Sequence, residues 1–160
     1  MTGHDATRTA TILVNAGGGS AGEDGAARVS DALAKAGIHG KVEEVEGGKL
    51  AERAAAVVKA GARLVIAAGG DGTQSAVAGA LAGSDATLGI IPLGTLNHLA
   101  RDLGIPFDLD EAAAIIAARH APHVRRARVT TRRARARQHR ADAAVAVGGV
   151  LHEVVDRPRA

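Results

Sequence analysis

The sequence predicts an α/β domain in which helices cover both faces of a parallel sheet. Three observations predict this class. Short apolar runs alternate with segments whose apolar residues recur at helical spacing. Glycine follows most of the helical segments, as is typical of helix ends. Glycine-rich turns also follow three of the apolar runs, and ligands bind beyond the carboxyl ends of parallel strands.

The first sixty residues predict two strands and two helices. Residues 9–15 form an apolar run typical of a buried strand. Apolar residues at helical spacing predict a helix over 26–36, which Gly37 ends. Residues 41–45 predict a weaker strand, and the alanine-rich segment 49–60 predicts a second helix.

The middle of the chain predicts two further strands and a helix between them. Residues 63–68 hold Leu-Val-Ile-Ala-Ala and give the strongest strand signal. A helix is expected over 73–82 and another strand over 87–91.

Two shorter helices are expected next. Residues 97–103 precede a glycine and a proline, which stop a helix. Asp108 or Asp110 is placed to cap a helix over 112–119. The four predicted glycine stops are Gly37, Gly61, Gly83 and Gly104. Together these elements predict a three-layer, Rossmann-like domain, and one more strand is expected over 143–150.

The amino-acid composition excludes several classes of protein and of active site. The 160 residues suffice for one domain with a core, but Phe107 is the single aromatic residue, so the core must consist of Ala, Val, Leu and Ile. The absence of cysteine excludes disulfides, thiol catalysis and Cys-based zinc sites. No uncharged apolar run approaches the roughly 20 residues of a membrane helix, and the polar N-terminus is unlike a secretory signal. We therefore expect a cytoplasmic protein whose contact with a membrane is peripheral.

Charge divides the chain into two regions. Residues 1–123 hold 10 Lys and Arg against 14 Asp and Glu, a net charge of −4. Residues 124–160 hold 10 Arg against 3 Asp and Glu, a net charge of +7, and eight of these arginines lie between Arg125 and Arg140. An Arg-rich segment can contact nucleic acid or anionic lipid. Because no aromatic residue is interleaved for base stacking, we favour a solvated charge run over a nucleic-acid site.

The first glycine turn carries the main chemical signal. Gly69-Gly70-Asp71-Gly72-Thr73 joins the predicted strand 63–68 to the next helix, so its N–H groups can cradle a phosphate. A carboxylate beside phosphate is repulsive unless a cation or a proton lies between them. Asp71 thus indicates either Mg²⁺ or a general base for an attacking hydroxyl. The alternative is that Asp71, on an exposed turn, only caps the helix that follows.

Two other turns offer weaker signals. Thr95 and Asn97 follow the predicted strand 87–91 and suit either helix caps or hydrogen bonds to a nucleotide. Asn15 ends the first strand, where it either shapes a turn or orients a nucleotide. The segment after Asn15 is no P-loop, because no Lys-Ser or Lys-Thr follows its glycines. All three turns can converge at the carboxyl edge of one sheet.

At these residues the chain resembles the catalytic domain of the diacylglycerol kinase family, which includes bacterial lipid kinases and sphingosine kinases. The resemblance spans about residues 11–122 and rests on three segments. These are Ile12-Leu13-Val14-Asn15, Gly69-Gly70-Asp71-Gly72-Thr73, and the long, specific block from Gly89 to Pro106 (GIIPLGTLNHLARDLGIP). NAD kinases carry a similar Asp motif but no such block, so they are the minor alternative.

The resemblance implies transfer of the γ-phosphoryl group of ATP to the hydroxyl of a diacylglycerol-like or sphingoid lipid at a membrane surface. It implies that Asp71 is the catalytic residue and a ligand of Mg²⁺. The residues that it places around ATP are Asn15, Gly69, Gly70, Gly72, Thr73, Gly94, Thr95 and Asn97. Apart from the resemblance, we expect no nucleic-acid partner, and a homodimer is left open.

The sequence departs from the family pattern in two places. Leu96 and His98 stand where many members have Gly and Asp, which bears on the acceptor more than on the fold. Family members continue into a mostly β second domain, whereas residues 124–160 here form an Arg-rich segment and the incomplete start of such a domain. We therefore expect residues 1–123 to be the nucleotide-binding domain and the second domain to be largely absent, through truncation or a frameshift. A nucleotide-binding module without turnover is the resulting alternative, since water exclusion and a complete magnesium shell need both walls of the cleft.

Overall fold

The computed structural model describes residues 9–17, 24–119 and 144–145. Its strands are β1 (Thr9–Asn15), β2 (His39–Val45), β3 (Leu64–Gly69), β4 (Thr87–Pro92) and β5 (Ala144–Val145). Its helices are α1 (Gly25–Lys35), α2 (Leu50–Lys59), α3 (Asp71–Leu81), α4 (His98–Asp102) and α5 (Leu109–Arg119), and a 3-10 turn, η1, spans Gly47–Lys49. These bounds fall within about three residues of those expected from the sequence, apart from the last strand, for which only 144–145 are described.

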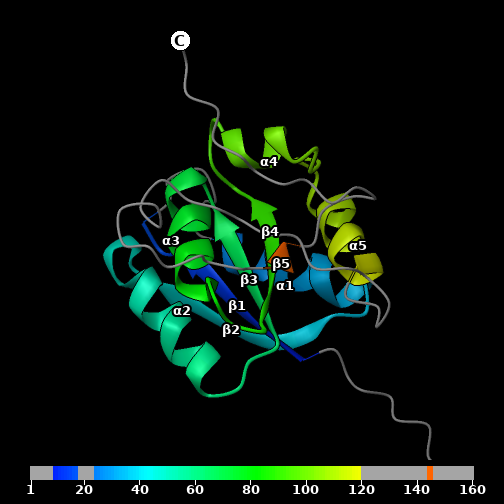
Figure 1. Cartoon of the computed structure of the whole chain (residues 1–160). Helices are drawn as coiled ribbons and strands as arrows, with labels where there is room; N and C mark the ends of the chain where they lie inside the picture. Colours follow the sequence, from blue (N-terminus) through cyan, green and yellow to red (C-terminus); the bar gives the residue numbers. More distant parts are fainter. Residues whose placement is uncertain (1–8, 18–23, 120–143, 146–160) are drawn as a thin grey trace, which may run out of the picture.

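The strands form one parallel sheet in the order β2-β1-β3-β4-β5. Helices α2 and α3 cover one face and α1 and α5 the other, which gives three layers (Figure 1). The predicted fold class is confirmed. Because β5 pairs with β4, residues 144–145 extend this sheet, whereas the prediction of a second domain after residue 123 stays a prediction.

The core consists of aliphatic side chains, as the composition predicts. All six residues of β3 are buried, which suits a central strand covered on both faces. Gly89 of β4 lets α5 pack closely, since a Cβ there would lie 3.0 Å from Ile66 and 3.1 Å from Ile116. The largest fully buried side chains are Ile12, Leu13, Leu33, Ile38, Leu50, Leu64, Ile66, Leu81, Leu88, Ile90, Ile91 and Ile116.

The predicted glycine stops are confirmed by the backbone. Gly37, Gly61, Gly83 and Gly104 have φ values of +77°, +100°, +77° and +67°, the left-handed region that favours glycine. After Gly37, the N–H of Ile38 donates to the carbonyl of Leu33 at 2.9 Å, and the same pattern follows Gly104. These bonds pair carbonyls that would otherwise lack partners at the helix ends.

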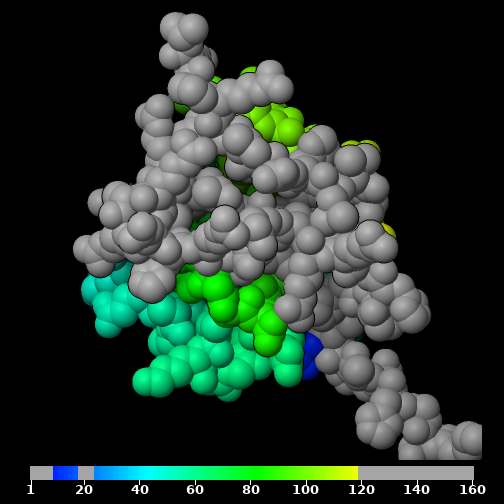
Figure 2. All heavy atoms as spheres, in the orientation of Figure 1, coloured from blue at the N-terminus to red at the C-terminus, as the bar shows by residue number. Residues whose placement is uncertain are grey.

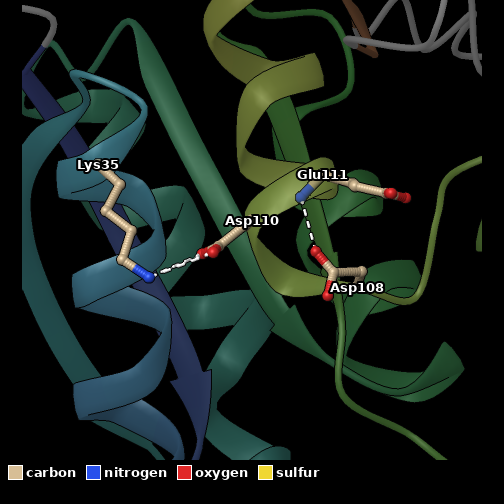
Figure 3. Close-up of polar contacts among 4 residues, drawn as sticks. All are labelled: Lys35, Asp108, Asp110 and Glu111. Atoms are coloured by element: carbon tan, nitrogen blue, oxygen red, sulfur yellow. Dashed lines mark hydrogen bonds and ion pairs between the residues drawn. The ribbon is translucent and has the colours of Figure 1, made fainter.

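The hydrogen bonds of Asp108 and Asp110 show which of these two aspartates caps α5. Asp108 accepts a hydrogen bond from the N–H of Glu111 at 2.9 Å, so Asp108 is the cap (Figure 3). Asp110 instead faces Lys35 of α1, with Nζ 3.2 Å from Oδ2. This exposed pair joins two helices on the same face but contributes little stability.

A stronger ion pair joins the edge strand to α2. Arg53 donates from Nε to Oε2 of Glu43 at 2.5 Å and from Nη2 to Oε1 at 2.7 Å. The Glu43 side chain is only 14% exposed. The hydrogen bonds from Arg53 lower the pKa of Glu43 from 4.5 to about 2, although burial opposes this shift.

We expect Glu43→Gln to lower the free energy of unfolding at neutral pH by about 1 kcal/mol. Because the folded pKa of Glu43 lies below its unfolded value of 4.5, the stabilisation is complete above pH 4.5 and is lost as the pH falls toward about 2. Urea unfolding of the wild type and the variant at pH 7 and about pH 3 measures the difference. Glu44→Gln, at the exposed neighbour, is the control. An equal difference at both pH values would contradict this account.

The carboxyl ends of the strands lie at one end of the molecule. In Figure 1 the arrows of β3 and β4 point toward α4, whose residues are at the surface there in Figure 2. The turns that follow β3 and β4 therefore share one edge with α4, where the candidate site lies.

Within the described part of the chain, no helix combines the length and apolarity needed to span a bilayer.

Candidate active site

The turns after β3 and β4 are in direct backbone contact. Gly69 pairs with Pro92 in the last register position of the two strands, so both turns leave the sheet side by side. A Cβ on Gly94 would lie 2.5 Å from the Cα of Gly70, and a Cβ on Gly70 would lie 3.3 Å from the Cα of Gly94. Only glycine at position 94 permits this approach, because real Cβ atoms essentially never come within 3.0 Å of another heavy atom. The structure thus brings two of the three predicted turns together.

Asp71 links these two turns. It is the first residue of α3, whose N-cap is Gly70, so helix α3 begins two residues earlier than expected. Its Oδ1 accepts a hydrogen bond from the N–H of Leu99, in the first turn of α4, at 2.9 Å. The expectation of an exposed turn is wrong, because Asp71 is half-buried. It does cap a helix, but that helix is α4 rather than the following α3.

The side chains behind the first turn are buried. The carbonyl of Gly69 accepts hydrogen bonds from the N–H of Leu93 and from Nε2 of Gln74, both at 3.0 Å. The Thr73 hydroxyl and Oε1 of Gln74 are buried, and neither has a hydrogen-bond partner among the described residues. Gln74 was not predicted as part of the site. Its spacing from Val77, Ala78 and Leu81, the buried face of α3, is the sequence signal that could have found it.

Asn97 shapes the second turn from within. Its Oδ1 accepts from the N–H of Gly94 at 3.0 Å, and its Nδ2 donates to the carbonyl of Gly94 at 2.5 Å. Asn97 is 4% exposed and has φ and ψ of +49°, in the left-handed region. It occupies the N-cap position of α4, as the sequence suggests, but its side chain makes no capping hydrogen bond.

The remaining predicted residues lie at the surface or further along the sheet edge. Thr95 and His98 are exposed, as is Leu96 at 57%. Asn15 accepts from the N–H of Gly17 at 3.0 Å, and a Cβ on Gly47 would lie 3.6 Å from its Oδ1. Asn15 therefore contacts its own turn and Gly47, which follows β2, and its expected contact with nucleotide stays a prediction.

The residues present fit a phosphate group. The first turn of a helix carries N–H groups that lack partners within the helix, and here they belong to Gly70 to Thr73. A Cβ on Gly72 would meet nothing within 4 Å, so this turn leaves open space where a side chain would otherwise project. The Thr73 hydroxyl, which lacks a hydrogen-bond partner among the described residues, is buried against Gly69 behind this turn. Backbone donors and the positive end of the α3 dipole favour an anion at such a turn.

The fit to Mg²⁺ depends on one carboxylate. Among the residues that the structure describes, no group of three or more His, Cys, Asp or Glu side chains could hold a metal ion. Magnesium needs no such cluster when phosphate oxygens and water supply its other ligands. Asp71, with one oxygen on the N–H of Leu99, can provide the single carboxylate ligand at its second oxygen.

Comparison with known proteins identifies one family, and the relatives named below carry the same family name. The family model described as "Diacylglycerol kinase catalytic domain" matches residues 9–129. Over 62 residues the chain is 48% identical to a protein of Mycobacterium tuberculosis named diacylglycerol kinase. The matched segment covers 39% of this chain and 20% of that protein. A diacylglycerol kinase of Bacillus subtilis is 60% identical over 45 residues, or 27% of this chain and 15% of the relative.

A solved structure supports the same grouping. The crystal structure of a diacylglycerol kinase from Bacillus anthracis matches with a TM-score of 0.56 and 29% identity, covering 71% of this chain and 43% of the other. The chain thus spans less than half of that structure's length and a fifth or less of the two curated relatives' length.

Proposed function

Because the chain belongs to the diacylglycerol kinase catalytic domain family, we propose that it carries the nucleotide-binding part of an ATP-dependent lipid kinase. The reaction is transfer of the γ-phosphoryl group of ATP to a lipid hydroxyl. The observation that carries this proposal is the hydrogen bond from the N–H of Leu99 to Asp71, which joins two glycine turns in contact. We assign nucleotide binding to the domain of residues 1–123.

We place the phosphates of ATP over the first turn of α3. The N–H groups of Gly70, Gly72 and Thr73 would donate to phosphate oxygens, and the open space beside Gly72 would admit them. Gly94 and Thr95, across from this turn, would border the same nucleotide. This assignment uses glycine for the reason expected from the sequence, which is that a side chain would occupy the place of the ligand.

We place the chemistry at Asp71. Asp71 is the residue that would hold Mg²⁺, and the ion would supply positive charge that offsets the charge of the phosphates during transfer. Oδ1 accepts the N–H of Leu99, so Oδ2 would take one of two roles, as the ligand of Mg²⁺ or as the acceptor of the proton from the lipid hydroxyl. As that proton leaves, the hydroxyl oxygen bonds to the γ-phosphorus, the bond to the β-phosphate oxygen breaks, and ADP departs.

We propose a lipid acceptor presented at a membrane surface. The net charge of +7 over residues 124–160 would attract anionic lipids, whereas residues 1–123 carry −4. This attraction would bring the chain to the surface where a diacylglycerol-like or sphingoid hydroxyl is available. Raising the salt concentration should weaken it, because exposed charges are screened.

The test is transfer of labelled γ-phosphate from ATP with Mg²⁺ to diacylglycerol and sphingoid lipids in mixed micelles, with NAD as a further acceptor. A labelled lipid is the expected product, and its identity names the acceptor. ATP binding without any product would support the alternative, a nucleotide-binding module without turnover. Labelled NADP would support an NAD kinase-like enzyme instead. A chain that neither binds ATP nor transfers phosphate would overturn the proposal.

A further inference from the structure

We propose that Asn97 is a positioning residue that fixes the separation of the two glycine turns, rather than a ligand of the nucleotide. This inference rests on the proposed function, because it names the residue that sets the geometry of that same site. It begins from the side-chain amide of Asn97, which makes one hydrogen bond to the N–H and one to the carbonyl of Gly94. With 4% of the residue exposed, the amide has little surface left for another molecule.

The backbone of Asn97 explains why it can reach Gly94. Among the described residues other than glycine, Asn97 alone has a positive φ. Asparagine tolerates this left-handed conformation better than most residues. An ordinary N-cap is extended and points its side chain along the helix that follows. Here the left-handed N-cap instead accompanies a side chain bonded to the preceding turn, so the first N–H groups of α4 must find another acceptor.

Asp71 supplies that acceptor from the other turn. The N–H of Leu99, two residues into α4 from Asn97, donates to Oδ1 of Asp71 at 2.9 Å. The contacts therefore close a ring. It runs from Gly70 to Asp71 along the chain, across to Leu99, back to Asn97, then through the amide to Gly94, whose Cα touches Gly70. In such a ring, loss of the Asn97 amide frees Gly94 and alters the position of both turns.

The test compares Asn97→Gly with wild type in the full chain. Glycine keeps the left-handed backbone but removes both hydrogen bonds. In the nucleotide-free protein, we expect the Gly94 amide to exchange with solvent about tenfold faster and the Gly70 amide resonance to shift. We also expect about tenfold weaker ATP binding, because the turns are no longer preorganised. Asn97→Asp keeps the acceptor for the Gly94 N–H and should recover part of the exchange protection.

Two controls separate positioning from general stability. Asp108→Ala removes the cap of α5 and lowers stability, but it should leave the Gly70 resonance and ATP affinity unchanged. Leu96→Ala changes the exposed neighbour and should leave all readouts unchanged. If Asn97→Gly weakens ATP binding while the nucleotide-free Gly94 and Gly70 signals match wild type, Asn97 contacts the nucleotide and the inference is overturned. If wild type binds no ATP, the proposed function fails, and the nucleotide-free measurements still decide the role of Asn97.

Discussion

Asp71→Ala should abolish phosphoryl transfer and also destabilise the chain, whereas Asp71→Asn should abolish transfer with little loss of stability. Alanine removes the acceptor for the Leu99 N–H, a helix-capping interaction worth about 1 kcal/mol. Asparagine keeps an Oδ1 in the same place but carries no charge. It can therefore cap α4, yet it can neither hold Mg²⁺ as a carboxylate nor take a proton from a hydroxyl.

Three measurements on each variant check this pair. Urea unfolding gives the stability, where we expect a loss of about 1 kcal/mol for alanine and a few tenths for asparagine. The labelled-phosphate assay gives transfer, where we expect none from either variant. ATP titration without turnover shows whether the turn still binds phosphate. Transfer by Asp71→Asn at the wild-type rate would remove the carboxylate from the mechanism, whatever the stability of the chain.

The fold was largely predictable because its signals are local. The stops of α1, α2, α3 and α4 each depend on one glycine, and Gly37, Gly61, Gly83 and Gly104 all adopt the positive φ that a stop requires. The alternation of apolar runs with helical spacing determines the order of strands and helices. A short connection after each strand then favours a parallel sheet with helices on both faces. The aliphatic core follows from composition alone, since the chain has one aromatic residue.

For the candidate site, the sequence predicts residues but not the contacts between them. Sequence patterns identify Asp71 as a cap or a catalytic residue, but they do not show which helix it caps. That answer requires contact between residues 28 positions apart, Asp71 and Leu99. The same holds for Asn97, whose capping position is local but whose side chain turns back because of a left-handed backbone. Gln74 was missed because a polar residue on a buried helix face has no motif of its own.

Gly94→Ala is the second substitution for which we expect a large effect. A Cβ there would lie 2.5 Å from the Cα of Gly70 and 2.8 Å from Oδ1 of Asn97, so both turns must move apart. Overpacking of this kind costs about 1–3 kcal/mol. We expect ATP binding to weaken more than the stability does, because the separated turns no longer face the same phosphates. Calorimetric ATP titration beside thermal unfolding measures both effects.

Two substitutions within α3 test whether the loss of ATP affinity in Gly94→Ala comes from lost contacts with the phosphates. A Cβ at Gly72 or at Gly79 meets nothing within 4 Å, and both residues lie in the helix, so alanine should stabilise each variant by up to about 1 kcal/mol. Gly72 lies in the turn where we place the phosphates, and Gly79 lies two turns further along the exposed side of α3. Gly72→Ala should therefore lose ATP affinity while gaining stability, and Gly79→Ala should gain stability alone. Full ATP affinity in Gly72→Ala would show that the phosphates bind elsewhere. The loss of ATP affinity in Gly94→Ala would then result from disturbed packing of the turns.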